Sequence, residues 1–265
     1  MFLFLHIPKT AGTTFQFILE NSFGITHCHL GHVGRKVIDQ RDLNLVRSWF
    51  PGLQSIAGEN LFDPLRLSLP APFYMTFLRE PITRVFSHYQ DDFQRCGKKI
   101  GFEEMLRTDE RLENFQVKCL AGRPDLDRAK QVLEKFNFVG LSEKFDLSLH
   151  VLNRLSPAGL NLNYKRKLTA PDNTIKRSLQ QDQRMVDLAR EHNRLDLQLY
   201  DFATKEIFPQ FCAQAGCLPT DEVASYEQKM TERQPKILLH RLYNRVFFRQ
   251  ICKVYRRLRA CQGTA

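Results

Sequence analysis

A short apolar segment at the amino end of the chain, followed by a loop rich in hydroxyl side chains, sets the strongest limit on the fold. Phe2-Leu3-Phe4-Leu5 is apolar at every position, which is typical of a parallel strand buried on both faces. After the loop 6–14, apolar residues recur at helical spacing, and we expect a helix from Thr13 to about Ser22. Strand, loop and helix in this order form half of a βαβ unit.

The rest of the chain continues this alternation and then becomes helical. We expect strands at 53–57, 73–78 and 136–139. We also expect one helix that begins at Pro81 and further helices at 112–120, 125–135, 142–155 and 178–208. Alternating strands and helices favour a parallel sheet covered on both sides. The sequence therefore predicts an α/β fold with a helical carboxyl-terminal part.

The loop His6-Ile7-Pro8-Lys9-Thr10-Ala11-Gly12-Thr13-Thr14 has the composition of a phosphate-binding loop. A loop that opens a helix presents free backbone N–H groups and the positive end of the helix dipole. Gly12 allows close approach of an anion, Lys9 adds a positive charge, and the threonines can donate hydrogen bonds. It is not a Walker loop, because the lysine precedes the single glycine. An ordinary helix amino-terminal cap is the alternative interpretation.

A second polar motif follows the strand predicted at 73–78. Arg79 stands at the carboxyl end of that strand, where open α/β sheets bind ligands, and Arg84 and Ser87 lie in the first turns of the next helix. A guanidinium fork and a serine hydroxyl together can hold a second phosphate. The alternative is a local salt bridge between Arg79 and Glu80.

The two motifs in this order resemble those of sulfotransferases that use 3′-phosphoadenosine 5′-phosphosulfate (PAPS). H-I-P-K-T-A-G-T-T is similar to their 5′-phosphosulfate loop, and F-L-R-E-P-I-T-R-V-F-S-H-Y to their 3′-phosphate-binding strand and helix. The form P-K-T-A-G-T resembles most the branch of uronyl 2-O-sulfotransferases and their bacterial relatives. The similarity is looser through 114–122 and 138–145 and fades beyond Tyr200. It implies a sheet and helices arranged as in P-loop NTPases.

The resemblance also implies roles for the matched residues. Lys9 is expected to stabilise charge on the leaving phosphate, in a direct transfer without a metal. Arg79 and Ser87 are expected to hold the 3′-phosphate of PAPS. The expected acceptor is a hydroxyl of a carbohydrate or glycoconjugate. The residues expected to bind the 5′-phosphosulfate are Lys9, Thr10, Ala11, Gly12, Thr13 and Thr14.

Two residues are candidates for the general base that takes the proton of the acceptor hydroxyl. The uronyl-type relatives carry a histidine after a strand that precedes the 3′-phosphate arginine, and Glu59 stands at that position here. His32 is the rival, because other branches place their catalytic glutamate at a similar distance after the lysine of the loop. We prefer Glu59 by position. A helix cap for Glu59 and an ordinary loop histidine for His32 are the structural alternatives.

The charge of the chain is concentrated at its carboxyl end. The net charge is +10, and the residues after Glu232 include nine basic and no acidic side chains. From Ile237 to Leu258, apolar residues recur at helical spacing beside a basic residue at every fourth position. We therefore divide the chain into a catalytic domain, 1–232, and a basic amphipathic tail, 233–265. The tail suits an anionic membrane surface, a polyanionic acceptor or acidic patches on the body, and the alternative is a closing helix packed on the core.

Other features give weaker expectations. The first apolar run is too short for a secretory signal, so we expect a cytoplasmic protein, peripherally attached to the inner membrane face, with no nucleic-acid partner. His27, His29 and His32 flank Cys28, but no second cluster completes a zinc site, and none of the seven cysteines forms a C-x-x-C pair. The basic loop 165–167 is either a cover over the nucleotide or a solvated charge run.

Two other function classes remain open. A nucleotide kinase or other P-loop NTPase shares the strand–loop–helix arrangement, but the Walker motif and a clear strand ending in a magnesium-binding aspartate are missing. A non-catalytic binder of anionic surfaces explains the tail and leaves both phosphate motifs without a role.

Overall fold

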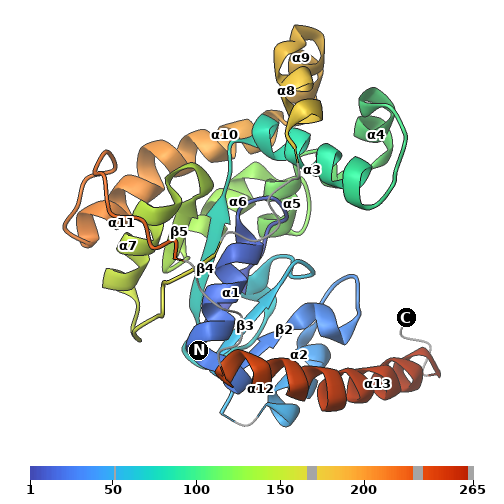
Figure 1. Ribbon diagram of the computed structural model, residues 1–265, viewed down its shortest axis with the longest axis vertical. Helices are drawn as coiled ribbons and strands as arrows, with labels where there is room; N and C mark the ends of the chain where they lie inside the picture. The colour runs from blue at the N-terminus through green and yellow to red at the C-terminus, as the bar shows by residue number, and fades with distance from the viewer. Residues whose placement is uncertain (51, 166–171, 229–234, 262–265) are drawn as a thin grey trace.

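The centre of the molecule is a five-stranded parallel sheet. The computed structural model describes residues 1–50, 52–165, 172–228 and 235–261. The strands are β1 (Phe2–Leu5), β2 (His27–His29), β3 (Ser55–Gly58), β4 (Phe73–Leu78) and β5 (Phe138–Leu141). Their order is β2-β3-β1-β4-β5, and all neighbouring strands are parallel (Figure 1). The predicted α/β class is confirmed.

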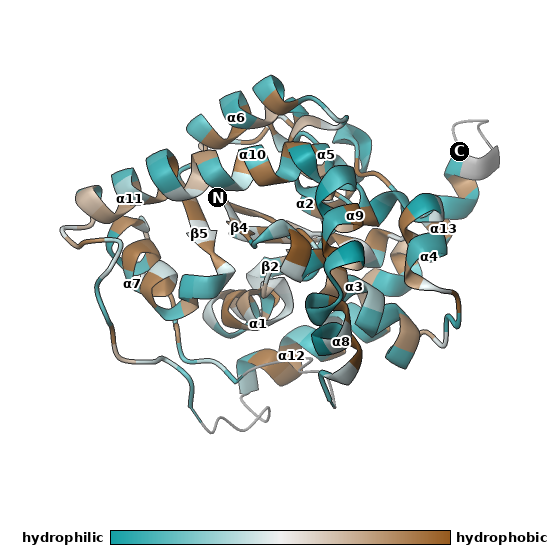
Figure 2. Cartoon of the chain, turned by 90° about the horizontal axis from the view of Figure 1, so that it is seen from above, coloured by the Kyte–Doolittle hydropathy of each residue, from teal (hydrophilic) through white to brown (hydrophobic). Residues whose placement is uncertain are grey.

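Helices flank this sheet and make up the carboxyl-terminal part. They are α1 (Gly12–Phe23), α2 (Gln40–Trp49), α3 (Pro81–Arg95), α4 (Phe102–Thr108), α5 (Phe115–Ala121), α6 (Leu126–Glu134), α7 (Phe145–Leu155), α8 (Thr174–Gln181), α9 (Gln183–His192), α10 (Arg194–Phe202), α11 (Phe208–Gln214), α12 (Pro235–Tyr243) and α13 (Arg249–Cys261). Short turns of 3-10 helix are η1 (Gly24–Thr26), η2 (Leu30–Val33), η3 (Pro64–Arg66), η4 (Glu110–Leu112) and η5 (Ser142–Lys144), and π-helical turns are η6 (Ala203–Ile207) and η7 (Asn244–Phe248). Seen from above, the sheet lies between α1 and α7 on one side and α5, α6 and α10 on the other (Figure 2).

Aromatic side chains join α1 to the sheet. The Phe15 ring lies 4.7 Å from that of Phe4 and 5.0 Å from that of Phe77, between centroids. Phe77 in turn meets Phe138 at 5.8 Å. All four are fully buried, and such ring pairs add to the free energy gained by burial. The packing fixes the start of α1, and therefore the loop before it, relative to β1 and β4.

The topology creates a crevice at the carboxyl ends of β1 and β4. The chain leaves β1 toward β2 on one side of the sheet, and it leaves β4 toward β5 on the other. Neighbouring strands whose connections diverge in this way open a ligand-binding crevice in α/β proteins. Both phosphate motifs of the sequence follow these two strands.

The structure corrects several predicted elements. Strand β2 was not predicted, because it is only three residues long and reads His-Cys-His, although His27 and Cys28 are fully buried. The segment 178–208, predicted as continuous helical periodicity, is broken: Asp182 caps α9 by accepting from Arg184 N and Met185 N, and α10 ends in a π-helical turn. Competition of the Asp182 carboxylate for backbone N–H groups explains the first of these breaks.

The helical part braces the end of β4 through a chain of hydrogen bonds. The buried carboxylate of Asp196, on α10, accepts from the backbone N–H of Gln116 at 3.1 Å and of Val117 at 2.8 Å. The Gln116 amide then bonds both backbone groups of Arg79, accepting from N at 3.0 Å and donating to O at 2.9 Å. Asp196 thus acts through α5 on the position of Arg79.

We expect Asp196→Ala to lower the free energy of unfolding by about 3 kcal/mol, because it leaves two buried N–H groups and the charge of Arg84 without their acidic partner. Chemical denaturation measures the change. Asp201→Ala is the control: it removes an exposed carboxylate that pairs only with Lys205 on the same helical stretch, among the described ion pairs, and we expect a cost of less than about 0.5 kcal/mol. Equal costs for both variants would contradict the bracing role.

Candidate active site

One large cavity occupies the crevice predicted by the topology. It has a volume of about 1160 Å³ and is lined at the carboxyl ends of the strands by residues that follow β1, β3, β4 and β5. Of the residues predicted for the site, all except Thr10 and His32 line it. Those that do are Lys9, Ala11, Gly12, Thr13, Thr14, Glu59, Arg79 and Ser87.

The loop after β1 has an unusual backbone. Lys9 and Ala11 are in the left-handed region, with φ of 71° and 64°, which is uncommon for residues other than glycine. The Thr10 hydroxyl donates to the carbonyl of Ile7 at 2.8 Å and is fully buried. It therefore holds the shape of the loop and does not face the cavity. A left-handed loop at a helix amino terminus is the geometry of anion-binding nests.

Lys9 is held between the loop and α3. Its Nζ lies 3.3 Å from Oδ1 of Asp91, which also pairs with Arg95 at 3.2 Å. Burial lowers the pKa of the Lys9 ammonium, and Asp91 acts in the opposite direction. No sequence motif pointed to Asp91. Its place on α3, one helical turn after Ser87, is the signal that could have pointed to it.

Arg79 joins the two phosphate motifs. Its Nη1 donates to the backbone carbonyl of Lys9 at 2.9 Å, and its Nε lies 4.0 Å from Oε1 of Glu143. Burial lowers the pKa of Arg79, and Glu143 opposes this shift. The local alternative of an Arg79–Glu80 pair is not what the structure shows, because the Glu80 carboxylate caps α3 by accepting from Ile82 N and Thr83 N.

Arg84 is positioned differently from the prediction. It is fully buried, donates to the carbonyl of Arg111 at 2.8 Å and lies over the ring of Phe115 at 5.6 Å. It does not line the cavity. Arg84 thus supports the wall, and Arg79 with Ser87 remain on the surface of the cavity.

Glu59 contacts a histidine to which the sequence analysis gave no role. The Nε2 atom of His6 lies 3.4 Å from Oε1 of Glu59. Burial raises the pKa of Glu59, while Lys9 and Arg111 lower it. Burial, helped by His29, lowers the pKa of His6 to about 3, so the imidazole is neutral at physiological pH. The position of His6 directly after the apolar strand β1 is the sequence feature that could have indicated a place in the site.

His32 lies outside the cavity. It is part of η2, and its ring packs against that of His29 at 5.4 Å between centroids. Burial, with His29 and Arg249, lowers its pKa to about 3. Of the two candidate bases, Glu59 is the one that shares the cavity with Lys9.

A cluster beside the cavity has ligand atoms close enough for a metal ion. His88, Asp92 and Asp109 place these atoms within 4.8 Å of one another. However, Arg111 reaches Asp92 at 2.9 Å and also bonds Asp109, and Lys98 reaches Asp92 at 2.7 Å. These cations already neutralise the carboxylates. The cluster is an ion-pair network that shapes the wall.

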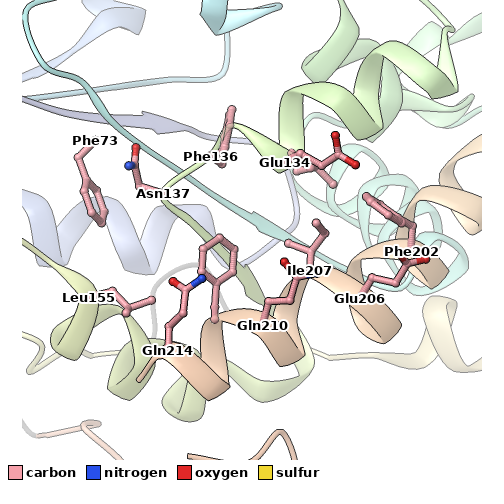
Figure 3. Close-up of a pocket in the computed structure, with 12 residues that line it drawn as sticks. Phe73, Glu134, Phe136, Asn137, Leu155, Phe202, Glu206, Ile207, Gln210 and Gln214 are labelled. Carbon is pink, nitrogen blue, oxygen red and sulfur yellow. The ribbon is translucent and has the colours of Figure 1, made fainter. Parts of the chain in front are cut away.

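A second cavity lies at the opposite end of the sheet. It has a volume of about 500 Å³ and lies beside Phe73, at the start of β4, and Asn137, just before β5 (Figure 3). Glu134 and Glu206 line it, and the described residues around it include no basic side chain. It therefore does not suit an anionic ligand.

The fold and the large cavity define an α/β protein with a candidate ligand site at the carboxyl ends of its parallel strands. The family model described as "Sulfotransferase family" matches residues 1–203. The chain belongs to the sulfotransferase family. It is also similar to the heparan sulfate 2-O-sulfotransferase hst-2 of Caenorhabditis elegans. The two sequences are 22% identical over an alignment of 254 residues, and the alignment covers 76% of this chain and 76% of hst-2. The resemblance to the branch of uronyl 2-O-sulfotransferases is confirmed.

The close approach of His6 to Gly12 gives a structural test of the site. A Cβ added to Gly12 would lie 1.9 Å from Cδ2 of His6. We expect Gly12→Ala to lower the free energy of unfolding by about 1–3 kcal/mol in the wild type, as overpacking does. In a His6→Ala background the same change should be neutral or stabilising, because alanine is the better helix former. Denaturation of the four proteins measures this coupling, and an equal cost in both backgrounds would show that the ring does not occupy this space.

Proposed function

We propose that this protein transfers a sulfuryl group from PAPS to a hydroxyl of a carbohydrate or glycoconjugate. The observation that carries the proposal is that Lys9, Arg79 and Glu59 line the same cavity, in a chain of the sulfotransferase family. The similarity to an enzyme named for heparan sulfate supports a carbohydrate acceptor.

The described residues fit a nucleotide with phosphate groups at two positions. The loop after β1, with Lys9 and the hydroxyls of Thr13 and Thr14, offers one anion site, and Arg79 with Ser87 offers another. The cavity is larger than the range of about 300–1,000 Å³ usual for small-ligand pockets, so it has room for a donor and part of an acceptor.

Each group around the cavity has a distinct role in the proposed reaction. PAPS supplies the sulfuryl group when it is bound. The ammonium of Lys9, oriented by Asp91, stabilises the negative charge that develops on the departing phosphate. The carboxylate of Glu59 accepts the proton of the attacking hydroxyl, and its raised pKa makes it a stronger base than a glutamate with an ordinary pKa. The neutral ring of His6, with Nε2 3.4 Å from Oε1 of Glu59, limits the orientation of that carboxylate by contact.

Basic residues on the rim indicate the kind of acceptor. Lys36, Arg111 and Lys176 line the same cavity and come from three separate parts of the chain. Arg111 is bound to aspartates, whereas Lys36 is exposed on the connection between η2 and α2. An exposed lysine at this place favours a sugar that carries an acidic group. This agrees with the acceptor named for the similar enzyme.

The donor is tested by thermal unfolding with nucleotides. We expect adenosine 3′,5′-bisphosphate to raise the melting temperature, and ATP with magnesium to raise it far less, since binding to the native state stabilises it by mass action. Arg79→Ala should remove most of this shift, because a main anion contact is lost. Arg123→Ala, on the exposed surface and away from the cavity, should retain the full shift. Equal stabilisation by ATP and magnesium would overturn the proposal.

The base is tested by Glu59→Gln. We expect the transfer rate from PAPS to chemically desulfated heparan sulfate to fall by roughly 10²–10⁴-fold, as loss of a general base does, with stabilisation by the bisphosphate retained. In the wild type the rate should fall as the pH drops through a pKa above 4.5, because burial raises the pKa of Glu59 and only its ionised form accepts a proton. His32→Ala is the control and should stay near the wild-type rate. A fully active Glu59→Gln variant assigns the base elsewhere.

A further inference from the structure

The helix at the carboxyl end contacts the body through one stripe of its surface. This tail helix comprises α12, η7 and α13 and runs along the edge of the molecule beside β2 and α2 (Figure 1). Its buried residues are Ile237, His240, Asn244, Phe248, Cys252 and Arg259. The Phe248 ring packs edge-on against Phe50 at 4.7 Å, and the Arg259 guanidinium reaches the carboxylates of Asp39 and Asp42 at 3.1 Å. This stripe holds the helix to the body.

The opposite face of the tail helix is apolar and exposed. Of the eleven large hydrophobic residues that are exposed in the described part of the chain, seven lie on it. Leu242, Phe247, Val254 and Leu258 are between 56% and 60% exposed. Figure 2 shows apolar patches between polar residues along α12. Seven large apolar residues of the tail helix therefore do not pack on the core, and a concentration of this kind marks an interaction surface.

Basic residues accompany the exposed apolar face. Arg245, Arg249, Lys253 and Arg257 are all exposed, and no acidic side chain among the described residues pairs with them. The acidic patch that the body offers, Asp39 with Asp42, is taken by Arg259 and by Arg35. A binding partner must therefore be both negatively charged and able to receive apolar side chains.

An anionic bilayer meets both requirements better than the other candidates. A second copy of the chain would bring two basic faces together, and the sequence after Glu232 has no acidic residue to relieve their repulsion. A soluble polyanion would leave the apolar side chains in water. The interface of an anionic membrane accepts both, and amphipathic helices with this pattern lie flat in it. No helix in the described part of the chain has the length and apolarity to cross a bilayer.

We propose that the outer face of the tail helix lies on anionic lipid membranes and attaches the protein peripherally. The helix is about 40 Å long at the usual rise per residue, so the whole edge of the molecule would rest on the surface. Its α12 part contacts η1, before β2, and its α13 part contacts η2, after β2. It therefore ends near the carboxyl end of the sheet, where the cavity opens. Arg256 lies against Gly34, two residues before Lys36 on the cavity rim.

The test is co-sedimentation of the full chain with vesicles. We expect binding to vesicles of phosphatidylglycerol and phosphatidylcholine, none to phosphatidylcholine alone, and weakening as salt is added. One variant replaces Arg245, Arg249, Lys253 and Arg257 with Gln, and another replaces Leu239, Leu242 and Phe247 with Gln. Each should weaken binding at least tenfold, with an unchanged unfolding midpoint, because the replaced side chains are exposed.

A matched variant controls for net charge. It replaces four exposed basic residues elsewhere, Arg123, Arg184, Arg190 and Lys205, with Gln, and should bind vesicles as the wild type does. If both four-residue variants bind vesicles equally weakly, overall charge explains the binding and the proposal is overturned. If the variant with Leu239, Leu242 and Phe247 replaced binds vesicles as strongly as the wild type, the proposal is also overturned, and the partner is a polyanion. Concentration-dependent self-association without vesicle binding would assign the face to a second copy. None of these outcomes affects the test of the donor.

Discussion

The hydrogen bond from the Arg79 guanidinium to the carbonyl of Lys9 joins the two sequence motifs that form this site. It spans the two central strands and ties the loop after β1 to the end of β4. Because Lys9 has a left-handed backbone, its carbonyl must be held for the loop to keep its shape. Arg79 is itself held by Gln116, and Gln116 by Asp196 on α10. The helical part of the chain thus contributes to the site without lining it.

Burial gives the charged groups of the cavity their chemical character. It lowers the pKa of Lys9 and of Arg79 and raises the pKa of Glu59, because each loses hydration. Opposite charges limit these shifts: Asp91 acts on Lys9, Glu143 on Arg79, and Lys9 on Glu59. The cavity therefore contains a set of interacting ions, and the neutral His6 ring contacts Glu59 without adding a charge.

The tail helix has a buried stripe that contacts the body and an apolar face that stays exposed. Tyr255 donates to Asp42 at 3.0 Å, and Arg259 pairs with the same carboxylate, so polar groups attach much of α13. The π-helical turn at Asn244–Phe248 adds a residue to the turn between α12 and α13 and rotates the two faces relative to each other. This attachment buries Ile237 and Phe248 and leaves seven other large apolar side chains outside, where the basic residues also lie.

The sequence by itself determined the α/β class, four of the five strands, the position of the loop after β1 and the pair Lys9 and Arg79, because these depend on local patterns: apolar runs, a glycine at a helix start, and an arginine after a strand. It preferred Glu59 to His32 by position alone. Only the tertiary structure decided that Thr10 faces inward, that Arg84 supports the wall, that His6 contacts Glu59 and that Asp91 holds Lys9. It also decided which face of the tail helix meets the body. The reason is physical: each of these depends on side chains from distant segments, whose competition for one buried space and for the same charges has no trace in local spacing.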